Sequence, residues 1–306
     1  MIDPSLLPAL QDVLMVVRAG SVCGAARRLH KTPSAVSQQI RRVEASFAVH
    51  LFERAGRGLR LTPAGNAALP FVNRLYDEAE AVFGLLSELS GNISTLLRIA
   101  ASDYLGKALL LPVIRELLVL RAPLRFEITT THSAEAPRSV QRTEIDFAVV
   151  TSRESFEGLE EKRLLVQRFV WVGPRIRGPR VPMRKRLEQE PLLRLASGSQ
   201  GRRLLDGYLE KERIVPVSTI DVPSVSLMLA YVSGGLGVGL APELALEQIE
   251  PSRVVTEAAP VEALPVKLVY RSNFHLTAAA DRFVQRLLRE GRRANRRLGS
   301  RAPDRG

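Results

Sequence analysis

The sequence predicts an α+β protein of several domains, in which an N-terminal winged helix-turn-helix is joined by a long linker helix to a C-terminal α/β domain. Short helical patterns and a small hairpin fill residues 1–62, a heptad seam follows within residues 63–91, and strands alternate with helices within residues 92–298. A chain of 306 residues is long enough for two domains with a hydrophobic core in each.

The composition is that of a globular protein, with 45% hydrophobic and 25% charged residues. The single cysteine, Cys23, excludes a disulfide scaffold and a cysteine-rich zinc site. No apolar run approaches the roughly 20 residues that span a bilayer, and the N-terminus does not have the pattern of a signal peptide. We therefore expect a cytoplasmic protein without a membrane partner.

The net charge of +12 is distributed unevenly along the chain. Residues 1–66 carry 9 basic and 4 acidic residues, and residues 286–306 carry 8 arginines and 2 acids, whereas the segment between them is nearly neutral. A basic N-terminal unit suggests a polyanionic partner such as nucleic acid. For residues 299–306 we expect a disordered, solvated basic tail.

The first 47 residues predict three short helices. Apolar residues recur at spacings of three and four over residues 4–19, and Ser21 is placed to cap a second helix over residues 22–29. A third helix begins at Thr32 or Pro33, because proline is tolerated in a first turn. Its back is apolar, and its other face carries Ser34, Ser37, Gln38 and Arg41.

Two helices joined by a tight turn, the second with an apolar back and a polar front, are typical of a helix-turn-helix. Hydroxyl, amide and guanidinium groups can contact base edges in the major groove. Two short alternating segments around residues 55–58 then predict a hairpin wing near the DNA backbone. The candidate DNA contacts are Thr32, Pro33, Ser34, Ser37, Gln38, Arg41, Arg54 and Arg57. From the residue pattern alone, a three-helix module that binds another protein is an open alternative.

A series of motifs in this unit carries a family resemblance. The motifs are Gly20-Ser21, Ala25-Ala26-Arg27-Arg28-Leu29, Thr32-Pro33-Ser34-Ala35-Val36-Ser37-Gln38-Gln39-Ile40, Glu44, Leu51-Phe52-Glu53-Arg54 and Leu61-Thr62-Pro63-Ala64-Gly65. Over residues 4–66, in order and without gaps, they resemble the winged helix-turn-helix of LysR-type transcriptional regulators. Two positions depart from the family: Phe47-Ala48 replaces the usual Leu-Gly, and Gln38 stands where many members carry arginine. The resemblance implies a transcription regulator that binds double-stranded DNA.

Residues 63–91 predict one long linker helix. Its apolar residues follow alternating spacings of four and three, which is an a/d seam, whereas a helix lying on its own domain would show a broader stripe. In the resembled family the same segment pairs two chains. The seam consists of Ala68 and the candidate dimerisation residues Val72, Leu75, Ala79, Val82, Leu86 and Leu89. We expect a homodimer or homotetramer that presents paired recognition helices to two promoter half-sites.

From residue 94 the pattern predicts α/β layers with a largely parallel sheet. Strands are expected at 97–101, 126–130, 145–150, 169–173, 192–196, 218–222, 238–240 and 267–270. Helices are expected at 106–119, 137–141, 202–211, 224–233, 242–247 and 277–293. The resemblance implies two similar subdomains of the periplasmic-binding-protein type, with chain crossings near residues 165 and 265 and an effector in the cleft between them.

Hydroxyl groups follow several of the expected strands, at or near helix starts, where open α/β sheets bind ligands. The candidate effector contacts are Ser102, Thr151, Ser197, Ser199, Gln200, Val222 and Pro223. Plain helix capping is the alternative for any one of these positions. Together they favour a small-molecule pocket that suits a carboxylate. Because Asp103 beside Ser102 would oppose an anion, the charge of the ligand stays open.

The sequence gives no reason to expect an enzyme, a cofactor or a metal site. The four histidines are scattered, and no nucleophile elbow or phosphate loop is present. The glycine-rich segment 234–239 leaves a helix and enters a strand, which is the reverse of a dinucleotide site. A solute receptor without DNA activity is the second alternative, but it leaves the N-terminal 66 residues unexplained.

Overall fold

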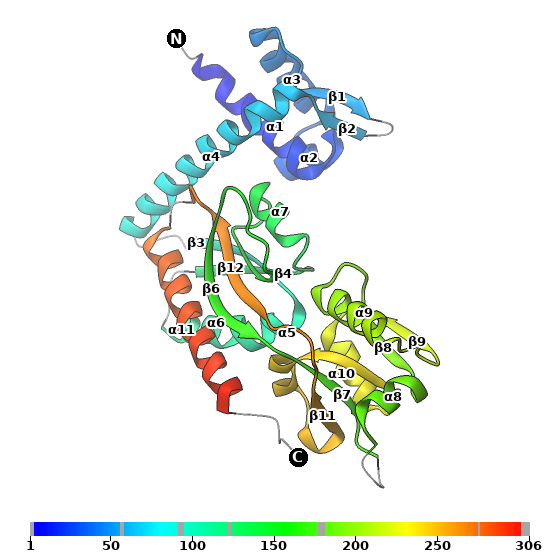
Figure 1. Ribbon diagram of the computed structural model, residues 1–306. Coiled ribbons are helices and arrows are strands. Elements are labelled where there is room, and N and C mark those ends of the chain that lie inside the picture. Colours follow the sequence, from blue (N-terminus) through cyan, green and yellow to red (C-terminus); the bar gives the residue numbers. More distant parts are fainter. Residues whose placement is uncertain are drawn as a thin grey trace. The chain divides into compact units, whose positions relative to one another are not determined.

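The computed structural model describes residues 3–55, 58–90, 95–120, 124–176, 181–274 and 276–300 (Figure 1). The chain divides into two compact units. The first contains residues 1–93 with the short segments 142–144 and 273–277, and the second contains the remainder.

The first unit begins with the predicted helices. A 3₁₀ turn, η1 (Pro4–Leu6), leads into α1 (Leu7–Ala19), which is followed by α2 (Val22–Leu29) and α3 (Pro33–Phe47). The Ser21 hydroxyl accepts a hydrogen bond from the Gly24 amide at 3.1 Å, and Thr32 Oγ1 accepts one from the Ala35 amide at 3.2 Å. The first contact confirms the expected cap at Ser21, and the second makes Thr32 the cap of α3. Apolar residues of the three helices form one core.

A two-stranded hairpin follows α3, as predicted. Strands β1 (Phe52–Ala55) and β2 (Gly58–Leu61) pair antiparallel, with Phe52 opposite Leu61. The Glu44 carboxylate accepts hydrogen bonds from the amides of Leu51 and Phe52, at 2.7 and 3.3 Å. This side chain therefore attaches the start of the hairpin to α3.

The linker helix is also confirmed as a helix, since α4 (Pro63–Ser90) is continuous through Pro70. The Tyr76 hydroxyl donates a hydrogen bond to the Leu7 carbonyl at 2.5 Å, so the first part of α4 packs on α1. The predicted domain boundary at residue 91 lies outside the described residues.

The second unit contains two five-stranded sheets. The first sheet has the order β4-β3-β5-β12-β6, with β3 (Thr95–Ala101), β4 (Leu124–Thr130), β5 (Phe147–Thr151), β6 (Leu159–Gln167) and β12 (Leu264–Arg271). The second sheet has the order β11-β7-β10-β8-β9, with β7 (Phe169–Pro174), β8 (Leu192–Leu195), β9 (Thr219–Val222), β10 (Val238–Pro242) and β11 (Val254–Ala258). Each sheet with its helices forms one subdomain.

The chain crosses between the subdomains twice, after β6 and again between β11 and β12, which confirms the expected topology. The expected largely parallel arrangement holds in part, because in each sheet one strand runs against the other four and both sheets are therefore mixed. In the first sheet β12 runs antiparallel to β5 and β6, and in the second β7 runs antiparallel to β10 and β11. Strands β6, β7, β11 and β12 carry the direct crossings, so no helical crossover sets them parallel to their neighbours.

Helices cover these sheets (Figure 1). They are α5 (Asp103–Leu105), the π-helical segment η2 (Gly106–Leu110), α6 (Leu111–Val119), α7 (Ala136–Gln141), α8 (Met183–Gln189), α9 (Gln200–Glu212), α10 (Val225–Ser233), η3 (Glu243–Gln248), η4 (Pro251–Arg253) and α11 (Ala278–Ser300). Helix α11 packs on β6 and α6. It reaches two residues into the segment expected to be a disordered tail, and residues 301–306 lie outside the described part.

No single helix in the described residues is long and apolar enough to cross a bilayer. The N-terminal pair Pro4–Ala19 and Val22–Leu29 passes jointly by length and composition, with a bend of 119° between them. Residues of both helices are buried in the core of the first unit.

Candidate functional site

The exposed face of α3 is the one that the sequence predicts. Its apolar back, formed by Val36, Ile40 and Val43, is buried in the core of the first unit. The opposite positions, with Thr32 and Pro33 at the start of the helix, face solvent, except that Ser37 is half-buried. The exposed residues are Thr32, Pro33, Ser34, Gln38 and Arg41. The face thus combines small hydroxyls, an amide and a guanidinium, which are groups that can contact base edges.

A partly buried ion pair joins α1 to the turn before α3. Lys31 Nζ lies 2.6 Å from Asp12 Oδ1, and Asp12 is completely buried on α1. The residue pattern does not indicate this pair, because Asp12 stands within an otherwise apolar helix face. The pair joins α1 to the residue directly before Thr32, the cap of α3.

The wing carries one predicted DNA contact in the described residues. Arg54 on β1 has an exposed side chain, and Arg57 lies outside the described residues. Arg60 on β2 binds Glu53 on β1 through two nitrogens, at 2.9 and 2.7 Å. This pair compensates the charge of Arg60, whereas the Arg54 side chain lies exposed on the same hairpin.

The predicted seam on α4 is largely solvent-exposed within one chain. Leu75, Val82 and Leu86 are 42%, 55% and 55% exposed, which is unusual for apolar side chains on one helix. Val72 differs from these residues, because it is only 8% exposed within one chain and has little surface left for a partner. Ala79 is half-buried, and the Leu89 side chain lies outside the described side chains.

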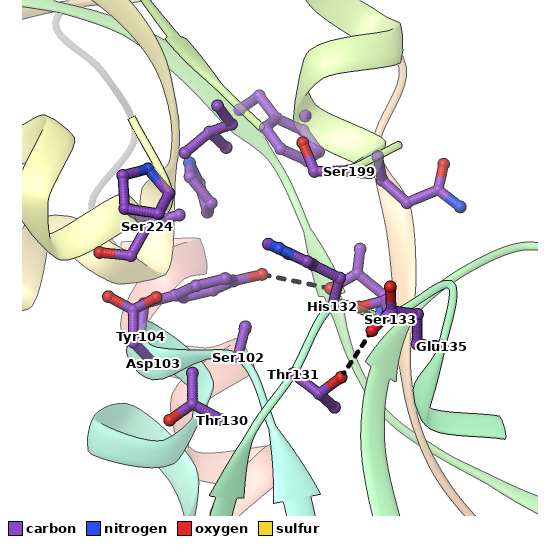
Figure 2. Close-up of a pocket in the computed structure, with 18 residues that line it drawn as sticks. Ser102, Asp103, Tyr104, Thr130, Thr131, His132, Ser133, Glu135, Ser199 and Ser224 are labelled. Carbon is purple, nitrogen blue, oxygen red and sulfur yellow. Dashed lines mark hydrogen bonds between the residues drawn. The ribbon is translucent and has the colours of Figure 1, made fainter. Parts of the chain in front are cut away.

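A cavity of about 220 Å³ lies between the two subdomains of the second unit (Figure 2). Five of the seven candidate effector residues line it: Ser102, Thr151, Ser199, Gln200 and Pro223. The other two do not. Ser197 is exposed on the loop before α9, and Val222 is buried at the end of β9.

The serine hydroxyls at the helix starts divide into two kinds. Ser199 and Ser224 cap α9 and α10, accepting hydrogen bonds from the amides of Arg202 and Leu227 at 3.1 and 3.2 Å. Ser102 precedes α5 but makes no cap bond, and its buried Oγ has no hydrogen-bond partner in the described structure. Because an unmade buried hydrogen bond is costly, this hydroxyl is suited to a ligand.

The cavity is also lined by residues that are not among the effector contacts expected from the sequence. Tyr104 is buried, and its hydroxyl lies 3.2 Å from Thr151 Oγ1. Burial raises the pKa of the Tyr104 phenol to about 12, so it stays protonated at neutral pH. Thr131, His132 and Ser133 directly follow β4, and Figure 2 shows His132 extending into the cavity. The rule that selected Ser102, a polar group after a strand end, could have found them.

Hydrogen bonds join the two subdomains beside the cavity. Asp103 Oδ2 accepts a hydrogen bond from the Ser226 amide on α10 at 2.9 Å, and Lys107 Nζ donates to Ser226 Oγ at 2.8 Å. Gln248 Nε2 donates to the Tyr104 carbonyl at 3.1 Å. A ligand that changes the angle between the subdomains must therefore break or rearrange these hydrogen bonds.

No group of three or more histidine, cysteine, aspartate or glutamate side chains in the described part of the chain is arranged to hold a metal ion. The cavity is instead lined by hydroxyls and apolar groups, including Phe169, Leu195 and Pro242. Such a lining can bind and orient a small molecule, but it presents no activated nucleophile.

Comparisons with known proteins match both units. The family description "Bacterial regulatory helix-turn-helix protein, lysR family" matches residues 7–66, and "LysR substrate binding domain" matches residues 90–292. The HTH-type transcriptional regulator YofA of Bacillus velezensis is 24% identical over 281 residues, which cover 89% of this chain and 94% of YofA.

Two solved structures share the fold. ArgP from Mycobacterium tuberculosis has a TM-score of 0.69 at 22% identity, covering 95% of this chain and 98% of ArgP. Full-length LysG from Corynebacterium glutamicum, solved with bound effector arginine, has a TM-score of 0.66 at 19% identity, covering 95% of this chain and 99% of LysG. The chain therefore belongs to the LysR family, and it is a DNA-binding transcription regulator, not an enzyme, whose activity is controlled by a small molecule bound in its C-terminal domain.

Proposed function

We propose that α3 reads promoter half-sites through Ser34, Ser37, Gln38 and Arg41. Thr32 and Pro33 stand at the start of this helix, and Arg54 and Arg57 contact phosphates from the wing. The observation that carries the proposal is the division of α3 into a buried apolar back and an exposed polar front. Direct base contacts require such an uncovered polar face, because they are made at base edges in the groove.

The second part of the proposal is pairing through α4. Leu75, Val82 and Leu86 would be covered by the same helix of a second copy, and Ala79 and Leu89 continue this seam. We assign residues 63–91 to this role, residues 1–62 to DNA binding, residues 92–298 to effector binding and residues 299–306 to a basic tail. Pairing would give a homodimer, or a homotetramer built from two dimers, that holds two recognition helices on double-stranded DNA.

The third part of the proposal is an effector that carries a carboxylate. The unpartnered hydroxyl of Ser102 and the start of α9 at Ser199 and Gln200 supply hydrogen-bond donors, with Thr151 and Pro223 completing the same cavity. The ligand must bind one arrangement of the paired DNA-binding units better than another, since only differential affinity shifts the population. Bacterial promoters lie in the cytoplasm, which is the compartment that this function requires.

The test is selection of bound sequences from a random DNA pool with the purified full-length protein, followed by a salt titration on the selected sequence. We expect an enriched inverted repeat with fixed half-site spacing and an affinity that falls steeply as salt rises. Salt-sensitive binding with no enriched sequence would contradict base reading by α3. Binding of a small molecule without any retention of DNA would favour the solute-receptor alternative.

A further inference from the structure

The charged groups that line the cavity are unevenly distributed between its two walls. The first subdomain contributes two carboxylates, Asp103 before η2 and Glu135 before α7. Among the described lining residues there is no lysine or arginine, and His132 is the only side chain able to carry a positive charge. Such a lining disfavours a dicarboxylate or a phosphate, because an anion with two charges would find no fixed cation and two like charges.

The second subdomain contributes positive helix ends. The starts of α9 and α10 both face the cavity, with Ser199 and Ser224 as their capping residues (Figure 2). The first amides of a helix have no partner within it, and the helix dipole adds partial positive charge there. The two walls therefore have opposite polarity.

One pair of these opposite charges is already satisfied within the protein. Asp103 Oδ2 accepts the hydrogen bond of the Ser226 amide at 2.9 Å, which places a carboxylate at the start of α10. At the start of α9, the Ser199 hydroxyl accepts a hydrogen bond from the Arg202 amide. Gln200 and Gly201, which come before Arg202 in the chain, line the cavity. The exposed Glu135 carboxylate accepts a hydrogen bond from Thr131 Oγ1 at Oε2, at 3.4 Å, which is long for a hydrogen bond.

What remains is one negative group on one wall, Glu135, and one positive end on the other, the start of α9. We propose that the effector is a zwitterion of the α-amino-acid type. Its carboxylate binds the amides at the start of α9 and the Ser102 hydroxyl, and its ammonium group faces Glu135. The proposal rests on the proposed effector function of this cavity and adds the second charge to it.

The size and the apolar lining fit this class of ligand. A cavity of about 220 Å³ is below the range of roughly 300–1,000 Å³ typical of drug-sized ligands, so it suits a molecule of amino-acid size. Phe169, Leu195 and Val225 supply apolar contacts for a side chain. The side chain of the effector would pack against these apolar residues, and its two charged groups would be held by the opposite charges of the two walls.

The experiment measures binding of three matched sets of compounds to the full-length protein by thermal denaturation and calorimetry. The sets are the L-amino acids, the 2-hydroxy acids with the same side chains, and the primary amines that lack only the carboxylate. We expect at least one amino acid to bind, with its hydroxy-acid and amine analogues weaker by about tenfold or more, the effect of losing one charged hydrogen bond.

The matched variants are Glu135→Gln and Glu154→Gln. Glu135→Gln keeps the shape of the side chain but removes its charge. It should therefore weaken the binding of the amino acid by about tenfold and leave the affinity for the matching hydroxy acid unchanged. Glu154 is exposed in the same subdomain and does not line the cavity. Glu154→Gln should therefore change neither the affinity for the amino acid nor the affinity for the hydroxy acid. Thermal denaturation without ligand should give the same midpoint in both variants as in the wild type, which shows that the effector domain is folded.

The outcomes separate the two proposals. If a hydroxy acid binds as tightly as its amino acid, the proposed carboxylate site is kept and the proposed contact between the ammonium group and Glu135 is rejected. If amines bind as tightly as amino acids, the proposed carboxylate contact is wrong. If no compound of the three sets binds while the protein still selects an operator, the zwitterion and the carboxylate are both rejected and the DNA-binding function stands.

Discussion

The hydroxyl groups of Tyr104 and Thr151 meet 3.2 Å apart inside the effector domain. Tyr104 follows β3 and Thr151 ends β5, and these two strands are parallel neighbours, so both residues lie at the same edge of the first sheet. Both side chains are buried, and both line the cavity. The relationship joins a residue that the sequence selects as an effector contact, Thr151, to one that it does not.

The first prediction is that Tyr104 ionises far above an ordinary tyrosine. Burial raises its pKa to about 12, against the usual value near 10. Above pH 10 the unfolded chain loses this proton while the folded chain keeps it, so folding stability contributed by this group is lost as pH rises from 10 toward 12. The check is ultraviolet absorbance titration of tyrosinate in the wild type and in Tyr104→Phe. The chain has five tyrosines, and the difference between the two curves isolates one. A difference curve centred near pH 10 would show that the phenol is solvated.

Much of the fold could be predicted because local signals agree with it. The Ser21 cap can be read from the sequence, and the glycines after Ala55 mark the hairpin. Strands β6 and β11 and helix α8 were missed. Strand β6 (LEEKRLLVQ) mixes charged and apolar residues without clear alternation, and its place next to β12 depends on a contact more than 90 residues away in the chain.

The candidate site was predictable where it depends on strand ends, and less so where it depends on tertiary packing. Ser102 and Thr151 directly follow or end strands of one sheet, and a sheet edge brings them together. Ser197 and Ser199 stand two residues apart on either side of Gly198, which has a φ of 90°, and only Ser199 lines the cavity. The heptad pattern also cannot show that Val72 is nearly buried within its own chain.

The second prediction concerns Ala48, which ends α3 with a φ of 50°. This left-handed conformation is unfavourable for a residue with a Cβ, and it is the place where a glycine would be expected. Ala48→Gly should therefore stabilise the protein, by about 0.5–1 kcal/mol, measured by urea unfolding of the N-terminal unit within the full-length chain. Ala45→Gly is the matched control, because Ala45 is exposed inside the same helix and glycine there should destabilise by about 1 kcal/mol. Equal destabilisation by both would show that Ala48 is not strained.

The third prediction is that the linker helix pairs two chains through Leu75 and Leu86. Replacing both by glutamate places four like charges in one seam of a dimer, and the variant should sediment as a monomer. Arg74→Glu is the control, since Arg74 is exposed on the same helix outside the seam and should leave the mass unchanged. The measurement is sedimentation velocity over a range of concentrations. A double variant that keeps the wild-type mass would reject the seam.

The fourth prediction separates base reading from backbone binding. Gln38 is exposed on the polar face of α3, and an amide there can form two hydrogen bonds with an adenine edge in the major groove. Gln38→Ala should cost about 1–3 kcal/mol on the preferred operator and should change which base is preferred at one position. Arg54→Ala should instead weaken binding to all sequences alike and reduce the steepness of the salt dependence, because a phosphate contact carries no sequence information.

The measurement for this pair is the affinity of each variant for the selected operator and for all single-base substitutions of one half-site, at several salt concentrations. Arg57→Ala is expected to behave like Arg54→Ala. A Gln38→Ala variant that loses the same free energy on every sequence would place Gln38 on the backbone. An Arg54→Ala variant that changes the base preference would place the wing in a groove, where arginine side chains can contact bases as well as phosphates.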